Sequence, residues 1–351
     1  MPKSFRVASF NALNLLESGV FFAGRKDEDA YPEAIYEAKV EWIVRTLKDA
    51  QADLVGFQEL FSERAFREVT TKAGLSHTFI PDLVGGKNMQ PRANGGIEAR
   101  GPFVGLASRF PILEADRIRE FPEGTANLAI QPLEGGPTVD LPFDRFQRPV
   151  IRAKVQLRDD VSATVFVAHL KSKRIQILSE EVGREREPMV VAAGSARALM
   201  IRAAEAVALR KLIIDATQGT TTPVILFGDL NDDLSSVTTQ IIGGEEPFRF
   251  AKPAEQQAVV DRLLYSVHDI EENESYRDVS YSHIFNGRYE LLDHIFVSRE
   301  LYHRHEGHIA AVRITRIFND HLFDERRVVN PGRGPSPRSD HGIPVTEIEW
   351  R

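Results

Sequence analysis

The chain of 351 residues contains no cysteine. This absence excludes a disulfide scaffold, a thiolate nucleophile and any zinc or iron–sulfur site built on cysteine ligands. No segment approaches the roughly 18 consecutive apolar residues that a transmembrane helix requires, so we expect no integral membrane association. The first residues carry charge but lack the apolar segment of a signal peptide, and a strand is predicted from residue 5 onward. These features favour a cytoplasmic location.

The overall composition is that of a globular protein. Hydrophobic residues make up 42% and charged residues 27% of the chain, which argues against disorder. The formal net charge of −7 disfavours nonspecific attraction to phosphate polymers, although net charge says little about a single cleft.

Short apolar runs alternate with helical stretches along the whole chain. The spacing of apolar residues predicts helices over 33–50 and 194–216. Short apolar runs, most of them rich in Val, Ile or Phe, predict strands over 5–10, 53–57, 103–107, 150–157, 163–169, 224–227, 291–297 and 343–348. The pattern indicates a mixed α/β fold. There is no tandem repeat and no shift in composition that would mark a linker, so we expect a single domain over residues 1–351.

Three stretches rich in glycine, proline or charge look like surface insertions, at residues 18–32, 82–101 and 324–338. Long irregular loops in compact domains are usually functional or mobile.

Acidic, amide and imidazole side chains stand at the ends of the predicted strands. They are Asn11, Gln58, Glu59, His169, Asp229, Asn231, Asp293, Ser339, Asp340 and His341. One Asp or Asn after a strand is normally a turn residue, so the argument rests on their joint pattern. Carboxylate oxygens suit a hard cation such as Mg²⁺, and histidines with carboxylate partners suit phosphate stabilisation or proton transfer. The pattern indicates a hydrolytic metal site.

Six segments carry a resemblance to a known family. FNALNLLE (10–17), DLVGFQEL (53–60), AHLKSK (168–173), GDLND (228–232), LLDHIFVS (291–298) and SDHGIPV (339–345) resemble, in order, the motifs of the endonuclease/exonuclease/phosphatase family. The resemblance spans about residues 5 to 348, and its style is most similar to bacterial nuclease-type members. It implies a four-layer α/β sandwich, with two mainly antiparallel sheets packed face to face and helices on both outer sides. It also implies Mg²⁺- or Mn²⁺-dependent phosphoester cleavage by in-line attack of water.

The resemblance also implies roles for single residues on the metal side. Glu59 matches the main metal-ligand glutamate, and Asn11 lies beside it on the first strand. Asp340 matches a second carboxylate on the metal side.

Five further residues match the catalytic positions. Asp229 matches the aspartate that orients or deprotonates the attacking water, and Asn231 the residue that positions water and phosphate. His169 matches the histidine that hydrogen-bonds the scissile phosphate. His341 matches the histidine that stabilises the developing charge or assists proton transfer, and Asp293 the carboxylate that orients it.

Two segments next to these residues are locally basic. Residues 169–211 contain nine Lys and Arg against five Glu, and residues 326–341 contain four Arg against one Asp. Charged loops are mostly solvated, but Lys171 and Arg338 are predicted phosphate contacts, with weaker candidates at Lys173, Arg174 and Arg333.

Several other residues receive a structural interpretation. Strand alternation sends His294 to the face opposite Asp293, and Trp42 is expected in the core. The remaining histidines are expected on a solvated surface: His77, His303, His305, His308 and His321. A substrate-facing loop is expected around Tyr281, His283 and Asn286.

Three functions remain open from the sequence. The first is a metal-dependent nuclease acting on DNA or RNA. The second is a phosphatase or phosphodiesterase for a small or lipid phosphoester, such as an inositol phosphate or a sphingomyelin-like head group. The acidic charge and the lack of an aromatic-plus-basic platform keep it open, whereas the motif style and the basic segments favour the nuclease. A membrane-surface substrate would need an exposed apolar patch, for which Val20, Phe21 and Phe22 are the obvious candidates. The third is a binding scaffold without activity, which predicts lost site residues, and none is lost.

Overall fold

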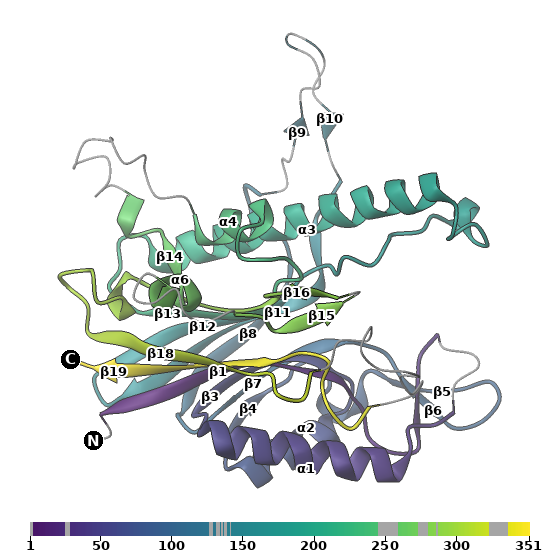
Figure 1. The fold of residues 1–351 in the computed structure, drawn as a ribbon, viewed down its shortest axis with the longest axis horizontal. Coiled ribbons are helices and arrows are strands. Elements are labelled where there is room, and N and C mark those ends of the chain that lie inside the picture. Colours follow the sequence, from purple (N-terminus) through teal and green to yellow (C-terminus); the bar gives the residue numbers. More distant parts are fainter. Residues whose placement is uncertain are drawn as a thin grey trace.

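Two six-stranded β-sheets pack face to face between two layers of helices (Figure 1). The computed structural model describes residues 3–24, 29–125, 142–244, 259–272, 280–285, 287–322 and 336–351, together with 129–130, 134, 136 and 139–140. The predicted four-layer α/β sandwich is therefore confirmed. Asn286, Arg333 and most of the expected insertion at 324–338 lie outside the described residues.

The first sheet contains, in spatial order, β18 (Ala310–Phe318), β19 (Ile343–Trp350), β1 (Ser4–Leu15), β3 (Leu54–Leu60), β7 (Phe103–Ser108) and β4 (His77–Phe79). Helices α1 (Glu33–Ala50) and α2 (Glu63–Ala73) cover its outer face. The α1 boundaries are those predicted from the apolar spacing. The Ser62 hydroxyl caps α2 by accepting a hydrogen bond from the Ala65 N–H at 3.2 Å.

The second sheet contains β14 (Leu264–Ser266), β17 (Asp293–Ser298), β13 (Val224–Asp229), β12 (Val161–His169), β11 (Arg145–Arg158) and β8 (Ile112–Glu120). Helices α3 (Pro188–Thr217) and α4 (Val237–Gly243) lie over its outer face (Figure 1). The α3 helix begins six residues before the predicted start. Pro188 stands in its first turn, where a missing N–H is harmless.

The remaining elements are short. They are β2 (Val20–Phe22), β5 (Met89–Pro91), β6 (Ile97–Ala99), β9 (Ala129–Ile130), β10 (Val139–Asp140), β15 (His283–Phe285), β16 (Arg288–Glu290), α6 (Val267–Glu272), and the 3₁₀ turns Val84–Gly86, Ser179–Glu181 and Arg299–Leu301. None of the helices in the described ranges is long and apolar enough to cross a membrane.

Each large sheet contains one parallel strand pair, and all its other pairs are antiparallel. In the first sheet β1 runs parallel to β3, and in the second sheet β12 runs parallel to β13. The carboxyl ends of two parallel strands meet at the same edge. Parallel pairing therefore brings together polar residues near the carboxyl ends of these strands, Asn11 and Glu59 on the first sheet and His169 and Asp229 on the second.

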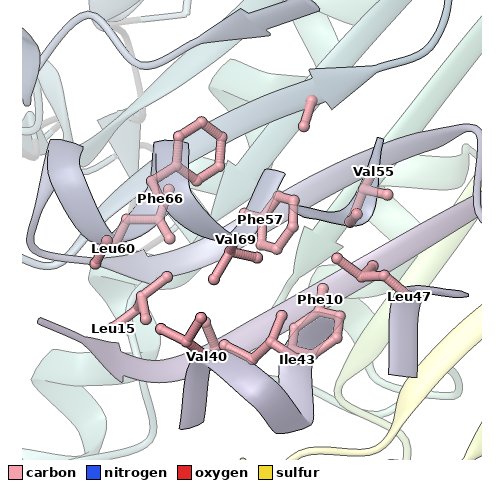
Figure 2. Close-up of a cluster of buried hydrophobic side chains, with 14 of the residues drawn as sticks. Phe10, Leu15, Val40, Ile43, Leu47, Val55, Phe57, Leu60, Phe66 and Val69 are labelled. Atoms are coloured by element: carbon pink, nitrogen blue, oxygen red, sulfur yellow. The ribbon is translucent and has the colours of Figure 1, made fainter. Parts of the chain in front are cut away.

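Three apolar clusters separate the layers. Between the sheets, the backbones approach closely at Gly56, where an added Cβ would lie 2.5 Å from the Cβ of Phe227. Between the first sheet and its helices, side chains of α1 and α2 meet those of β1 and β3 (Figure 2). Phe10, Ile43, Phe57 and Phe66 are fully buried there, and each such side chain contributes about 1.5–3 kcal/mol of burial free energy.

The expected insertions at 18–32 and 82–101 contain a small sheet. β2 pairs in parallel with β6, and β5 pairs antiparallel with β6. Val20 and Phe22 are buried in the core, and Phe21 lies under the Arg92 guanidinium, 3.9 Å from the ring centroid. These residues therefore do not offer the exposed apolar patch that a membrane-surface substrate would need, because pairing with β6 folds Val20 and Phe22 inward.

Candidate active site

The strand register places the predicted polar residues side by side. His169 pairs with Asp229, Asp229 pairs with Asp293, and Asn11 pairs with Gln58 at the ends of their strands. The loop before β19 joins this edge through Ser339, whose hydroxyl donates to the Asn11 carbonyl at 2.8 Å. Both sheets thus contribute to one constellation.

Asp229 lies at the centre of this constellation and is almost completely buried. Its Oδ2 accepts a hydrogen bond from Asn11 Nδ2 at 2.9 Å, and its Oδ1 accepts one from the Asn231 N–H at 3.0 Å. His169 Nε2 is 3.4 Å and His341 Nε2 is 4.0 Å from Oδ2. Burial raises the pKa of Asp229 to about 7. The carboxyl group therefore binds a proton more tightly than an exposed aspartate does.

His341 forms a buried pair with Asp293. The distance between His341 Nδ1 and Asp293 Oδ2 is 2.7 Å, and Ser282 Oγ donates to the same Asp293 oxygen at 2.7 Å. Burial alone would lower the pKa of His341, but the charges of Asp293 and Asp229 outweigh it and raise the pKa well above its ordinary value. These charges therefore favour the protonated form of His341, whose Nε2 lies on the side of Asp229.

His169 has the opposite electrostatic character. It is buried, and burial together with the positive charge of Arg148 lowers its pKa well below the ordinary value. Its Nδ1 has no hydrogen-bond partner among the described residues. A neutral imidazole at this position can donate from only one ring nitrogen.

Glu59 lies on a distorted segment of the first sheet. It has a positive φ of 61°, and Leu13 and Asn14 opposite it have φ values of 46° and 58°. The β1–β3 register shifts between Asn11 and Leu15, and the Asn14 N–H donates to Glu59 Oε2 at 3.0 Å. Side chains other than glycine rarely adopt this conformation, and such strain tends to be kept at functional sites. Here the bulge turns the Glu59 carboxylate toward the catalytic edge.

The acidic groups on this side have the chemistry of a divalent-cation site. Burial and the nearby Asp340 carboxylate raise the pKa of Glu59, and the Asp340 side chain is 54% exposed. Two neighbouring carboxylates that repel each other suit a hard cation, which would remove their repulsion. Asn11 Oδ1 accepts from the Leu13 N–H at 3.0 Å, which leaves one lone pair for a ligand. These three residues therefore have the donor chemistry of a divalent-cation site.

Other donor groups also cluster closely. The ligand atoms of His283, Asp340 and His341 lie within 4.8 Å of one another, as do those of Asp229, Asp293 and His341. In both groups His341 Nδ1 is already hydrogen-bonded to Asp293, so only Nε2 could reach a metal.

Lys39 of α1 supports the distorted segment and was not identified from the sequence. Its buried ammonium donates to the carbonyl of Ala12 at 3.1 Å and also to the carbonyl of Leu13. Burial lowers the pKa of Lys39 to about 8, although Glu59 and Asp340 act in the opposite direction. The helix thereby holds the β1 bulge in place behind the acidic groups.

Two residues of α3 support the loops of the second sheet in the same way. Glu205 accepts hydrogen bonds from the backbone N–H groups of Gln147 at 2.8 Å and Lys171 at 2.7 Å. Arg202 donates to Asp232 Oδ2 at 3.1 Å and to the Lys171 carbonyl at 3.0 Å. These bonds fix the chain just after His169 and Asn231.

The phosphate contacts expected at Lys171 and Arg338 stay predictions. The Lys171 ammonium donates to the carbonyls of Ser172 at 3.1 Å and Arg174 at 2.8 Å, so it is directed into its own loop. Lys173 pairs with Glu290 at 2.7 Å, and Arg338 is exposed. Arg148 contributes positive charge at the site, because it lowers the pKa values of both His169 and Glu59.

Five further histidines divide into three groups. His294 Nε2 lies 2.9 Å from the Asp232 carbonyl, on the face away from the site as predicted. His321, expected at the surface, instead contacts the Trp42 ring at 4.8 Å and the His341 carbonyl at 2.9 Å. Trp42 is buried, as expected. His303, His305 and His308 form no three-ligand cluster among the described residues.

Comparison with known proteins gives one consistent result. The sequence profile of the Endonuclease/Exonuclease/phosphatase family matches residues 8–341. An endonuclease/exonuclease/phosphatase family protein from Bacteroides thetaiotaomicron has a similar fold, with a TM-score of 0.51, 16% identity, and coverage of 100% of this chain and 99% of that chain. No curated protein sequence matches.

Two further solved structures share the fold. The human nocturnin catalytic domain with bound sulfate has a TM-score of 0.50 and 14% identity, and the alignment covers 100% of this chain and 96% of that chain. A mannosyl-6-phosphatase from Bacteroides thetaiotaomicron has a TM-score of 0.50 and 14% identity, with coverage of 99% and 100%.

Proposed function

Because the chain belongs to the endonuclease/exonuclease/phosphatase family of phosphoester hydrolases, we propose that it is a Mg²⁺- or Mn²⁺-dependent nuclease that cleaves DNA or RNA. The carrying observation is the buried Asp229 carboxyl, held by Asn11 and Asn231 and flanked by His169 and His341. We further propose that residues 1–351 form one catalytic domain and that the enzyme is cytoplasmic.

In the proposed reaction a water molecule attacks phosphorus in line with the leaving oxygen, and its proton passes to Asp229. A carboxyl group with a pKa of about 7 is a better base near neutral pH than an ordinary aspartate. The bonds from Asn11 and Asn231 hold both of its oxygens in fixed positions. Asn231 has a φ of 56°, and its Nδ2 donates to the Leu170 carbonyl at 3.1 Å, which orients the loop that faces the phosphate.

The two histidines face the charge that develops on the phosphate. His341 carries a proton at Nε2 while Asp293 holds Nδ1, so it stabilises that charge or protonates the leaving oxygen. His169, as a neutral imidazole, donates a hydrogen bond to a phosphate oxygen. Arg148 adds positive charge beside both groups, and its Nη1 donates to the Leu170 carbonyl at 2.9 Å.

Glu59 and Asp340, with Asn11, would hold the divalent cation. When bound, the cation supplies Lewis-acid stabilisation of the phosphate oxygens. The Asn14 N–H bond and the Lys39 support keep Glu59 oriented for this task.

A small phosphoester is the second candidate substrate. It is favoured by the inward orientation of the Lys171 ammonium and by the pairing of Lys173 with Glu290, which withdraw two of the described cations from contact with a polymer. The fold shared with the mannosyl-6-phosphatase is compatible with such a substrate.

An activity panel with Mg²⁺ or Mn²⁺ tests the proposal. It contains single- and double-stranded DNA, RNA, bis-p-nitrophenyl phosphate, inositol phosphates and sphingomyelin, with EDTA and the double variant Asp229→Ala/His341→Ala as controls. We expect metal-dependent cleavage of nucleic acid that the double variant loses. Cleavage of a small or lipid phosphoester alone would overturn the nuclease assignment. Absence of both activity and metal binding in the wild-type protein would favour the third function, a binding scaffold without activity.

A further inference from the structure

A short hairpin beside the catalytic histidine has no role in the mechanism described so far. It consists of β15 and β16, and its base is fixed to the site. The Gly342 N–H donates to the Ser282 carbonyl at 2.6 Å, and Ser282 in turn holds Asp293. On the other strand, Glu290 pairs with Lys173 at 2.7 Å. The hairpin is thus attached to the catalytic edge at both strands.

One face of the hairpin is directed toward His341. The register pairs His283 with Glu290 and Phe285 with Arg288, so these four side chains share a face. The His283 ring lies 4.9 Å from the His341 ring, and the Phe285 ring is stacked on His283 at 6.3 Å with an interplanar angle of 17°. A row of rings therefore leads from the catalytic imidazole to the tip of the hairpin.

The outer end of this row is open to solvent. Phe285 is 55% exposed, and Arg288 beside it is exposed and pairs with no carboxylate in the described part of the chain. On the opposite face the Tyr281 and Tyr289 rings meet edge to face at 4.9 Å, which supports the hairpin from behind. A substrate-facing loop is expected here from the sequence, around Tyr281 and His283, but Phe285 and Arg288 become neighbours only through strand pairing.

We propose that this hairpin binds the nucleotide next to the scissile phosphate of a single-stranded nucleic acid, with the base stacked on Phe285 and the adjoining phosphate on Arg288. The inference rests on the proposed nuclease function and deepens it. An exposed aromatic ring next to an arginine is the combination that recognises single strands, since every base has a π-face and every nucleotide a phosphate. A sugar phosphate or an inositol phosphate has no planar ring to stack there.

Paired substrates and variants test the stacking. The substrate is a single-stranded oligonucleotide with either a normal base or an abasic residue beside the cleaved bond. For the wild type we expect kcat/KM to fall about tenfold on the abasic substrate. Phe285→Ala should lose about tenfold on the normal substrate and become indifferent to the abasic residue. Phe285→Tyr should restore the preference, and Met189→Ala, at an exposed position on α3, is the matched control.

Binding gives a readout that does not depend on turnover. In the Asp229→Ala background, Kd for a fluorescent oligonucleotide is measured by anisotropy at several salt concentrations. Arg288→Ala should reduce the slope of log Kd against log salt by about 0.7, the value of one phosphate contact.

The outcomes separate the two proposals. Equal loss in Phe285→Ala on normal and abasic substrates would show a structural role and overturn the stacking site. Cleavage of nucleic acid with no response to Phe285 or Arg288 would also overturn it and leave the nuclease function standing. Failure to cleave any nucleic acid would overturn the nuclease function itself.

Discussion

The two sheets supply acidic groups of different accessibility to one site. On the first sheet, Glu59 is partly exposed and Asp340, in the loop before β19, has a side chain that is 54% exposed. On the second sheet, the side chains of Asp229 and Asp293 are 2% and 0% exposed. Accessible carboxylates can exchange a cation and its waters, whereas these buried carboxylates are shielded from solvent and held by fixed hydrogen-bond partners. The difference indicates that the first sheet provides the metal side and the second the proton chemistry.

The site has two halves, one on each sheet, and the interactions that hold each half in place also differ. The first half keeps its geometry through backbone strain at Leu13, Asn14 and Glu59, held by the Lys39 ammonium. The second half relies on a regular strand register, with Arg202 and Glu205 fixing the loops beyond it. Each half is thus anchored by charged residues of its own outer helix.

The largest expected effect comes from removing the proton chemistry of the second half. Asp229→Ala or His341→Ala should lower kcat by about 10³-fold or more while leaving the fold intact, because both groups act on the reacting atoms. Steady-state kinetics beside circular dichroism measures this. Asp233→Asn, two residues after Asn231, is the matched control and should keep near wild-type kcat. A loss below tenfold in either variant would contradict the assignment.

Removing the main carboxylate of the first half should affect metal binding. Glu59→Gln keeps the shape of the side chain but removes its negative charge. Changes in residues behind a metal ligand already cost about 10–100-fold in affinity, so we expect at least a 100-fold weaker Mn²⁺ Kd by calorimetry. Activity should partly recover at high Mn²⁺. Unchanged metal affinity would refute the assignment of metal binding to the first sheet and of proton chemistry to the second.

Asp293→Asn tests the pairing that keeps His341 protonated. The raised pKa of His341 means that this pair stabilises the protein fully below the ordinary histidine pKa, and that the stabilisation is lost as pH rises through the raised value. The variant should therefore lower Tm more at pH 6 than at high pH. The alkaline limb of its pH–rate profile should move to lower pH, with about a tenfold loss of kcat at neutral pH. An unmoved limb would argue against the pairing.

Much of the fold follows from the sequence because its signals are local. The apolar spacing of α1 and the short Val- and Ile-rich strands each predict one element, and the polar residues at the strand ends indicate the catalytic edge. Burial of Val20 and Phe22 could not be predicted, since it depends on pairing with β6, more than 70 residues away in sequence.

The supporting residues of the site were missed for a related reason. Lys39, Ser282 and Glu205 lie outside the family-like segments, and each reaches the site only through tertiary packing. Lys39 has the helical spacing of a core position on α1, where a lysine would normally extend to solvent. Lys171, by contrast, lies within a family-like segment, but its ammonium is used by the carbonyls of its own loop. The sequence pattern therefore predicted the type of chemistry better than it predicted the direction of each side chain.

The smallest expected effect comes from histidines that belong to neither catalytic half. His303, His305 and His308 follow the 3₁₀ turn at Arg299–Leu301, and the His305 ring lies 5.1 Å from that of Tyr265 and 5.5 Å from that of Tyr302. Replacing all three with Gln removes these ring contacts but no group at the catalytic edge. We expect kcat and the Mn²⁺ Kd to change less than twofold and Tm to fall slightly, because aromatic pairs contribute about 0.5–1.5 kcal/mol each. A large loss of metal affinity in this variant would place a metal-binding function outside both halves and break the comparison between them.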